Sequence, residues 1–468
     1  MPVAAIDQGT SSTRALVLDD TGASRIVAAF PHREFHPHPG WVEQDPLELL
    51  DNVMRCVEAC GRVEAIGLAN QGESCLAWDR VTLAPLTPVI VWQDQRTARR
   101  IAELASTGLA AEVAARAGLP LDCYFSATKL AWILEHSPAA RSASNAGRLR
   151  LGTTETFLLE CLTGVHATDV TTASRTSLMN LGARAWDPAL CRAFGIPPET
   201  LAPIFPSRMS FGDFRGIPIR TSIVDQQASL YGHGCRRRGD AKVTFGTGAF
   251  ALCLSGPAPP SGDLAGLSAT VAWQVDAEPQ YALEGGVYDA GAAIDWAMRI
   301  GVISDPSELH DFERTPAIER GIAFVPALSG LASPYWCRNA RATWTGLAAT
   351  TSRRDLQQSL LEGIALQTHL VLEAMHTVVP LADVLSVDGG MARNRYFLQF
   401  LADITGRRIL RLQDIERTAY GCALMARDRL CEPSARERGE YFEPAISGAT
   451  RGHWIEHYRK LADRVAVG

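Results

Sequence analysis

One short pattern occurs near the start of the chain and again just past its middle. Residues 3–6 are apolar, a polar turn around Thr10 follows, and residues 15–18 are apolar again. The same order returns at residues 242–254 around Thr247, about half of the 468 residues further on. A strand, a Gly-Thr turn and a second strand make a β-hairpin, so the repeat predicts two structurally similar halves that face each other. The alternative is that two such hairpins recur by chance.

The segments between and after these turns predict a mixed α/β chain. Apolar runs at residues 65–69 and 89–92 predict strands. Glycine and charge interrupt the apolar pattern at residues 231–239, where we expect a hinge between two domains, residues 1–232 and 233–468. Apolar residues spaced by three and four predict helices at residues 127–135, 155–162, 290–300, 353–378 and 393–405.

Composition and charge indicate which kind of molecule the chain binds. With 47% hydrophobic and 21% charged residues, a chain of 468 residues can bury a sizeable core and has room for two or three domains. The formal net charge of -6 and the pI near 6.0 disfavour nucleic acid and anionic membranes as partners. We therefore expect a small-molecule partner.

The cysteines and the first residues indicate the compartment. Eleven cysteines are scattered from Cys56 to Cys431 without a C-x-x-C pair, which argues against a disulfide framework and a zinc site. Asp7 comes before an apolar run of signal-peptide length can develop, and no stretch of about 18 apolar residues follows. We expect a cytoplasmic protein in a reducing compartment, with no membrane partner, as a monomer or a homo-oligomer.

The first turn carries groups suited to a triphosphate and its magnesium ion. Asp7 precedes it, and glycine, hydroxyl side chains and Arg14 follow within residues 9–14. Backbone N–H groups and hydroxyls can cradle phosphate oxygens, and the carboxylate can hold Mg²⁺ directly or through water. Ordinary turn chemistry explains the same composition. The phosphate interpretation gains support from Thr247 and from residues 387–390, a strand that ends in two glycines ahead of a helix.

Two other regions offer polar groups at strand ends. Asp225 follows an apolar strand, where a carboxylate can orient and deprotonate an attacking alcohol; alternatively it caps the helix that begins at Gln226. Trp92 and Tyr124 can present apolar faces to a carbon chain while Glu73 accepts hydrogen bonds from hydroxyls. The alternative is that both aromatic residues belong to the core.

Taken in order, these segments resemble the FGGY carbohydrate kinases, and within that family the glycerol kinases. The resemblance runs through the whole chain and implies an α/β fold of two actin-like, ribonuclease-H-like domains, with ATP and Mg²⁺ in the cleft between them. The matching stretches are residues 5–14, 90–94, 124–126, 128–129, 168–169, 173–176, 225–228, 245–248, 325–327, 333–336, 388–394 and 441–444.

Position by position, the resemblance implies where ATP lies. Its phosphates would lie between the two turns and its purine against the second domain. Asp295 stands where glycerol kinases usually carry glutamine. The implied phosphate contacts are Thr10, Ser11, Ser12 and Arg14 from the first half and Thr247 and Gly248 from the second, and the implied purine contacts are Gly291, Gly390 and Asn394.

For the acceptor, the resemblance implies a small polyol. It implies in-line transfer of the γ-phosphoryl group of Mg-ATP to a hydroxyl of glycerol or of a somewhat longer polyol or sugar, with Asp225 as the catalytic base. The alternative is a catalytically silent polyol sensor on the same fold. The implied acceptor contacts are Glu73, Trp92, Tyr124, Asp225, Gln226 and Phe250.

One acceptor position departs from the family. Glycerol kinases carry an arginine where this chain has Gly72, so a guanidinium that binds acceptor hydroxyls is missing there. The vacated space favours a tetritol or pentitol over glycerol. The alternative is that a nearby arginine or water refills the gap and glycerol remains the substrate.

Overall fold

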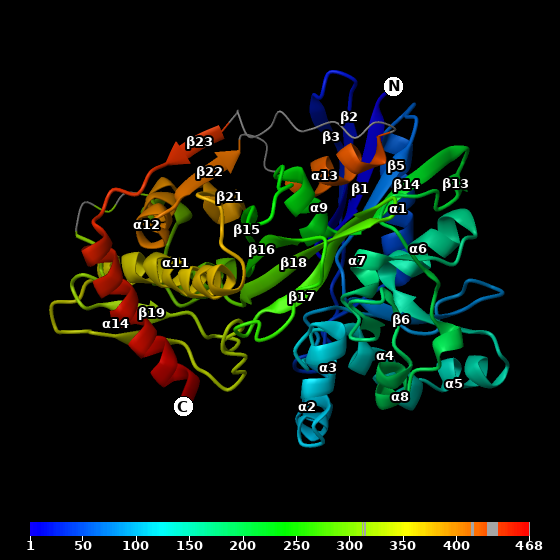
Figure 1. Cartoon of the computed structure of the whole chain (residues 1–468), viewed down its shortest axis with the longest axis horizontal. Coiled ribbons are helices and arrows are strands. Elements are labelled where there is room, and N and C mark those ends of the chain that lie inside the picture. The colour runs from blue at the N-terminus through cyan, green and yellow to red at the C-terminus, as the bar shows by residue number, and fades with distance from the viewer. Residues whose placement is uncertain (311, 313–314, 413–415, 428–438, 468) are drawn as a thin grey trace.

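Two large β-sheets organise the chain in the computed structural model, which describes residues 1–310, 312, 315–412, 416–427 and 439–467 (Figure 1). The first sheet is formed by β1 (Val3–Gln8), β2 (Ser12–Leu18), β3 (Ser24–Pro31), β5 (Ile66–Asn70), β13 (Asp213–Phe214) and β14 (Ile217–Val224). The second is formed by β15 (Ala241–Phe245), β16 (Ala249–Gly256), β17 (Ser268–Val275), β18 (Glu278–Val287), β21 (Val384–Gly389), β22 (Arg408–Leu412) and β23 (Gly439–Phe442).

The two sheets follow the same plan. Their strand orders are β13-β14-β5-β1-β2-β3 and β17-β18-β16-β15-β21-β22-β23. In each, an antiparallel hairpin (β1 with β2, β15 with β16) is continued on one side by a parallel strand, β5 or β21. A further parallel strand follows, β14 or β22. Both predicted hairpins are confirmed, and the sequence repeat marks two similarly built halves.

Helices and smaller sheets surround these two sheets. The helices are α1 (Pro46–Ala59), α2 (Ala98–Ala105), α3 (Leu109–Ala117), α4 (Ser126–His136), α5 (Pro138–Asn145), α6 (Thr154–Thr163), α7 (Val170–Ala173), α8 (Pro188–Phe194), α9 (Asp225–Gly232), α10 (Gly291–Arg299), α11 (Arg353–Val378), α12 (Arg395–Thr405), α13 (Arg417–Ala426) and α14 (Gly448–Val467). The remaining strands are β4 (Glu43–Gln44), β6 (Cys75–Asp79), β7 (Val89–Ile90), β8 (Leu149–Thr153), β9 (Thr168–Asp169), β10 (Met179–Asn180), β11 (Ala185–Trp186), β12 (Ile204–Phe205), β19 (Ala323–Val325) and β20 (Thr343–Thr345).

Local signals explain where several predicted elements begin and end. The helix α11 has the predicted bounds because Ser352 and Asp355 form a reciprocal capping box at its start. The helix predicted at residues 393–405 begins instead at Arg395, since the Asn394 side chain accepts the hydrogen bond from Phe397 N at 2.9 Å and caps it. The strand predicted at residues 89–92 is wrong beyond Ile90, where the chain leaves the four-stranded sheet β4-β7-β6-β8.

The helices α9 and α13 connect the two halves (Figure 1). Although α13 lies late in the chain, it packs against α9 and against β1 and β5 of the first sheet. The two helices approach so closely that a Cβ on Gly232 would collide with the carbonyl of Arg417, and one on Gly421 with the carbonyl of Ala228. Glycine at both positions therefore sets the spacing of the helix pair.

The ten cysteines within the described ranges are all free thiols; Cys431 lies outside them. Most are buried, and burial raises the pKa of the Cys56 and Cys75 thiols to about 12. Over the described residues, no helix is long and apolar enough to cross a bilayer.

Candidate active site

A cavity of about 640 Å³ lies where the two hairpin turns face each other. It brings together residues from β14, α9, β15, β16 and β18 and from the loops after β1, β5 and β7, which are far apart in the sequence. The predicted site residues that line it are Thr10, Ser11, Glu73, Trp92, Tyr124, Asp225, Gln226, Thr247, Gly248 and Phe250. The structure therefore gathers ten of the predicted residues around one space.

The two Gly-Thr turns form one end of the cavity. Gly9 N donates to Ser12 O at 3.1 Å and Gly246 N donates to Gly248 O at 2.9 Å, so both turns are closed by a backbone hydrogen bond. Gly248 has no room for a side chain, because a Cβ there would stand 2.8 Å from Val287 O. Backbone amides and threonine hydroxyls of such turns are suitable donors for phosphate oxygens.

Two carboxylates lie near each other at this site: Asp225 lines the cavity, and Asp7, which is not part of the lining, is close enough to repel it. Asp7 is near the end of β1, and Asp225 is the first residue of α9, where its Oδ1 accepts a hydrogen bond from Gln226 N at 2.6 Å. Burial raises the pKa of Asp225 to about 7; repulsion from Asp7 adds to this rise, and Lys242 opposes it. Burial also raises the pKa of Asp7 to about 7. A carboxyl group whose pKa is near 7 can accept a proton from a substrate at neutral pH and release it again.

A buried cation holds the neighbour of Asp225 in place. Lys242 Nζ donates to Gln226 Oε1 at 2.6 Å and to Thr244 Oγ1 at 2.8 Å. Because the amide oxygen of Gln226 is used by Lys242, its NH₂ group is the end available to a ligand. Sequence reasoning did not assign Lys242 a role.

Three aromatic side chains make the apolar part of the cavity. The Trp92 ring contacts those of Tyr124 and Phe250 edge to face, with centroids 5.5 and 6.1 Å apart. Trp92 Nε1 also donates to Thr10 Oγ1 at 2.9 Å, which links this aromatic group to the first turn. Such a group can pack against the C–H faces of a short carbon chain.

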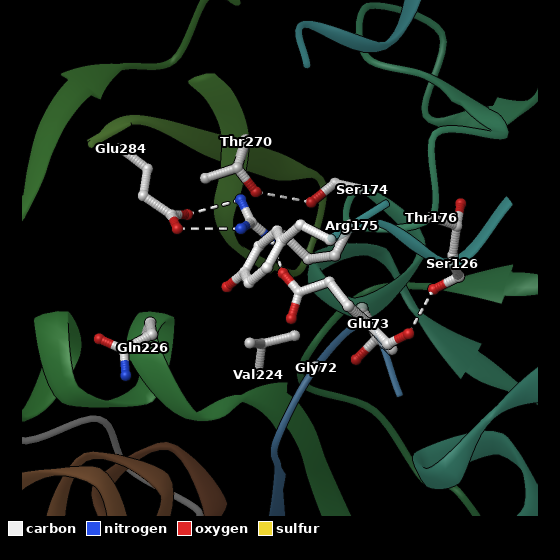
Figure 2. A network of polar contacts seen from close by, with 12 residues as sticks. Gly72, Glu73, Ser126, Ser174, Arg175, Thr176, Val224, Gln226, Thr270 and Glu284 are labelled. Carbon is white, nitrogen blue, oxygen red and sulfur yellow. Dashed lines mark hydrogen bonds and ion pairs between the residues drawn. The ribbon is translucent and has the colours of Figure 1, made fainter. Parts of the chain in front are cut away.

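A buried ion-pair network, shown in Figure 2, lies near the aromatic group, with Arg175 Cζ 5.7 Å from the centroid of the Tyr124 ring. Arg175 Nε donates to Glu73 Oε1 at 2.5 Å, and its NH2 donates to Glu284 Oε1 at 2.9 Å. Arg175 is 2% exposed. Burial raises the pKa of Glu73 to about 7, although the Arg175 charge opposes the rise. Sequence reasoning predicted Glu73 but missed Arg175 and Glu284; the match at residues 173–176 was the available signal for Arg175.

Val224 occupies the space beside Gly72. Gly72 has φ +61°, and a Cβ built on it would stand 3.1 Å from Val224 Cγ1 and 3.8 Å from Cγ2. Val224 lines the cavity and is 2% exposed. The isopropyl group of Val224 therefore takes room that the sequence analysis expected to be vacant.

The other predicted contacts lie outside the cavity lining. Arg14 forms an ion pair with Glu416 at 2.9 Å, and Ser12 begins β2. Gly291 N donates to Gly246 O at 3.0 Å, and a Cβ on Gly390 would meet open space. Asn394 caps α12 and donates to Leu309 O at 2.8 Å, so its amide is already engaged. These nucleotide contacts, like the predicted division at residue 232, stay predictions.

The sequence matches two family profiles in consecutive order. The N-terminal domain of the FGGY family of carbohydrate kinases matches residues 3–232, and its C-terminal domain matches residues 241–427. Together they cover most of the chain.

Relatives and solved structures agree with this match. The glycerol kinase of Rhodospirillum centenum is 41% identical, with 100% of this chain and 98% of the relative aligned. That of Methylorubrum populi is 42% identical over 91% and 88%. The crystal structure of Plasmodium falciparum glycerol kinase with ADP superposes with a TM-score of 0.89 at 30% identity, covering 99% of this chain and 98% of that one. Xylulose kinase from Lactobacillus acidophilus, at 20% identity and TM-score 0.88 over 99% and 98%, shares the fold.

Proposed function

The chain belongs to the FGGY family of carbohydrate kinases and is an ATP-dependent polyol kinase, and on this basis we propose that it phosphorylates glycerol, with Asp225 as the base. One observation carries the proposal: the Asp225 carboxylate lies in the same cavity as both Gly-Thr turns and the polar and aromatic pocket around Glu73 and Trp92. A phosphoryl donor held at the turns and an alcohol held in the pocket would meet at this carboxylate.

In this proposal the turns hold the nucleotide. Thr10 and Ser11 face Thr247 and Gly248 across the cavity, and their hydroxyl and amide groups would bind the phosphates from both sides. Positioning and charge neutralisation supply most of the rate in phosphoryl transfer, since the transition state is loose. Movement of residues 1–232 against residues 233–468 would close the cavity around both substrates and exclude water.

Asp7 suits the Mg²⁺ ion that accompanies ATP. Mg²⁺ is usually held by one or two protein carboxylates and completes its shell with phosphate oxygens and water. Asp7 lies on β1 just ahead of the first turn, and burial raises its pKa to about 7, which a nearby cation would lower. When bound there, Mg²⁺ would neutralise charge that develops on the phosphate oxygens.

Asp225 and its neighbours would act on the acceptor. The Asp225 carboxylate accepts the proton of the attacking hydroxyl, whose oxygen the neighbouring Gln226 NH₂ group also binds, and the Glu73 carboxylate binds a second hydroxyl. Trp92, Tyr124 and Phe250 pack against the carbon chain. The names of the aligned relatives, at about 40% identity, support glycerol as the acceptor.

A coupled assay of ADP release tests the proposal. Purified protein is mixed with Mg-ATP and with glycerol, erythritol, a pentitol or no acceptor, and the phosphorylated product is identified by mass spectrometry. We expect glycerol-dependent ADP release that Asp225→Asn lowers by about 10²–10⁴-fold while the variant still binds ATP. Binding of polyol without any turnover would contradict the proposal and indicate a sensor.

A further inference from the structure

The Val224 side chain, which lies beside Gly72, forms an apolar part of the acceptor pocket's wall. Gly72 follows β5 and Val224 ends β14, and these two strands pair in parallel with Val224 opposite Asn70. The Val224 isopropyl group lies against the point where a side chain on residue 72 would start, with Val224 Cγ1 3.1 Å from that Cβ position. Figure 2 shows Val224 between Glu73 and Gln226, next to Gly72.

The guanidinium beside this wall is already engaged. Among the described residues that line the cavity, Arg175 is the only arginine. Its Nε donates to Glu73, and its terminal nitrogens lie against both oxygens of Glu284, at 2.9 and 2.5 Å. Two carboxylates therefore neutralise Arg175 and hold it in one orientation. Arg175 therefore serves as the ion-pair partner of the two carboxylates and does not take over the hydroxyl binding that an arginine at position 72 would provide.

From these contacts, and resting on the proposed function, we propose that Val224 determines acceptor specificity: the kinase binds two acceptor hydroxyls through Asp225 and Glu73 and meets the remaining carbon with an apolar wall. Its acceptors then include three-carbon diols that lack one hydroxyl of glycerol. Because Val224 fills the space beside Gly72, the pocket stays of glycerol size and is not opened to pentitols.

The expected tolerance of diols follows from the difference between a polar and an apolar pocket wall. A site built to hydrogen-bond a substrate hydroxyl rejects the analogue without it by about 10⁴–10⁵-fold, because its own polar groups are left unpaired. An apolar wall has no such group to leave unpaired, and it discriminates by only about 10–200-fold. A water molecule fixed at Val224 would restore strict recognition, so the measured discrimination separates the two arrangements.

The test compares kcat/KM for glycerol, propane-1,2-diol and propane-1,3-diol. We expect at least one diol to be used within about 10³-fold of glycerol. Rejection of both diols by more than about 10³-fold would overturn the inference while leaving the proposed glycerol kinase activity intact. If glycerol itself gives no product, the proposed function fails, and a diol that is phosphorylated would still support the apolar wall.

Two variants assign the effect to Val224. Val224→Thr keeps the shape of the side chain and adds a hydroxyl, so the preference for glycerol over the better diol should rise about tenfold or more. Val224→Ala is the matched control: it lowers kcat/KM for all three acceptors and leaves the preference near that of the wild type. An unchanged preference in folded Val224→Thr would overturn the assignment. If that variant does not fold, the wild-type comparison decides the inference.

Discussion

Replacing Asp225 with asparagine separates the proposed chemistry of this residue from the cost of burying its charge. Asparagine has nearly the same shape, and its oxygen can still accept the hydrogen bond from Gln226 N, which is 2.6 Å from Asp225 Oδ1. It cannot take a proton from an alcohol. We expect phosphoryl transfer to fall by about 10²–10⁴-fold.

The same substitution should stabilise the protein at neutral pH. A rise in the pKa of Asp225 from 3.8 to about 7 corresponds to at most about 4 kcal/mol, at about 1.4 kcal/mol per tenfold change in the dissociation constant. Because the side chain is partly exposed in the cavity, solvent screening reduces this value. We expect the free energy of unfolding of Asp225→Asn to exceed that of the wild type by on the order of 2 kcal/mol.

The sign of the pH dependence follows from the raised pKa. Between pH 3.8 and about 7 the native Asp225 keeps a proton that the unfolded chain has lost, so its contribution to stability falls as pH rises. Above about pH 7 the native group is also charged and the cost is constant. The advantage of the asparagine variant is therefore absent below about pH 4, grows up to about pH 7 and then stays level.

Unfolding experiments on the free enzyme at several pH values check this reasoning. Wild type and Asp225→Asn are unfolded thermally and in urea near pH 5, 6 and 8 without ATP, and ADP release is measured in parallel. A variant that is no more stable than the wild type at pH 8, or whose advantage does not change with pH, would refute the argument from charge burial. Near-normal turnover would refute the role of Asp225 as base.

Arg175, Lys242 and Gly421 support further predictions. Arg175→Leu leaves the Glu73 and Glu284 carboxylates buried without their cation, so its free energy of unfolding in urea should fall by about 3–5 kcal/mol. Arg175→Lys should lose less, and unchanged stability of the leucine variant would contradict the ion-pair network. In the wild type, log kcat/KM should fall with decreasing pH below about 7 as Asp225 takes up its proton. Lys242→Met should move this limb to higher pH, because Lys242 lowers the pKa of Asp225; a profile that is flat, or unmoved in the variant, would count against this assignment. Gly421→Ala should lower the free energy of unfolding by about 1–3 kcal/mol, because the added Cβ forces α13 away from α9. In the control Gly448→Ala the added Cβ meets open space, so the change should stay below about 0.5 kcal/mol. Equal effects in thermal unfolding would be inconsistent with close helix packing.

Much of the site could be predicted because its parts are local. Each Gly-Thr hairpin is specified by a few consecutive residues, since a tight turn between two apolar runs limits how the chain can fold back. The start of α11 is likewise specified by Ser352 and Asp355, three residues apart. The apolar pattern placed Asp225 and Glu73 after predicted strands, the resemblance to a family assigned them to the acceptor, and the structure brings both to one cavity.

Contacts between distant residues were decided by the tertiary structure alone. Arg175 and Glu284 come from opposite halves of the chain, and nothing in the sequence around either indicates that they pair. Gly72 read alone indicated vacant space, but packing brings Val224 from a neighbouring strand to fill it. Local sequence determines turns, caps and periodicity through short-range sterics and hydrogen bonds. Which side chains share a pocket depends on how whole strands and helices pack. This packing results from many long-range contacts that form only in the folded chain.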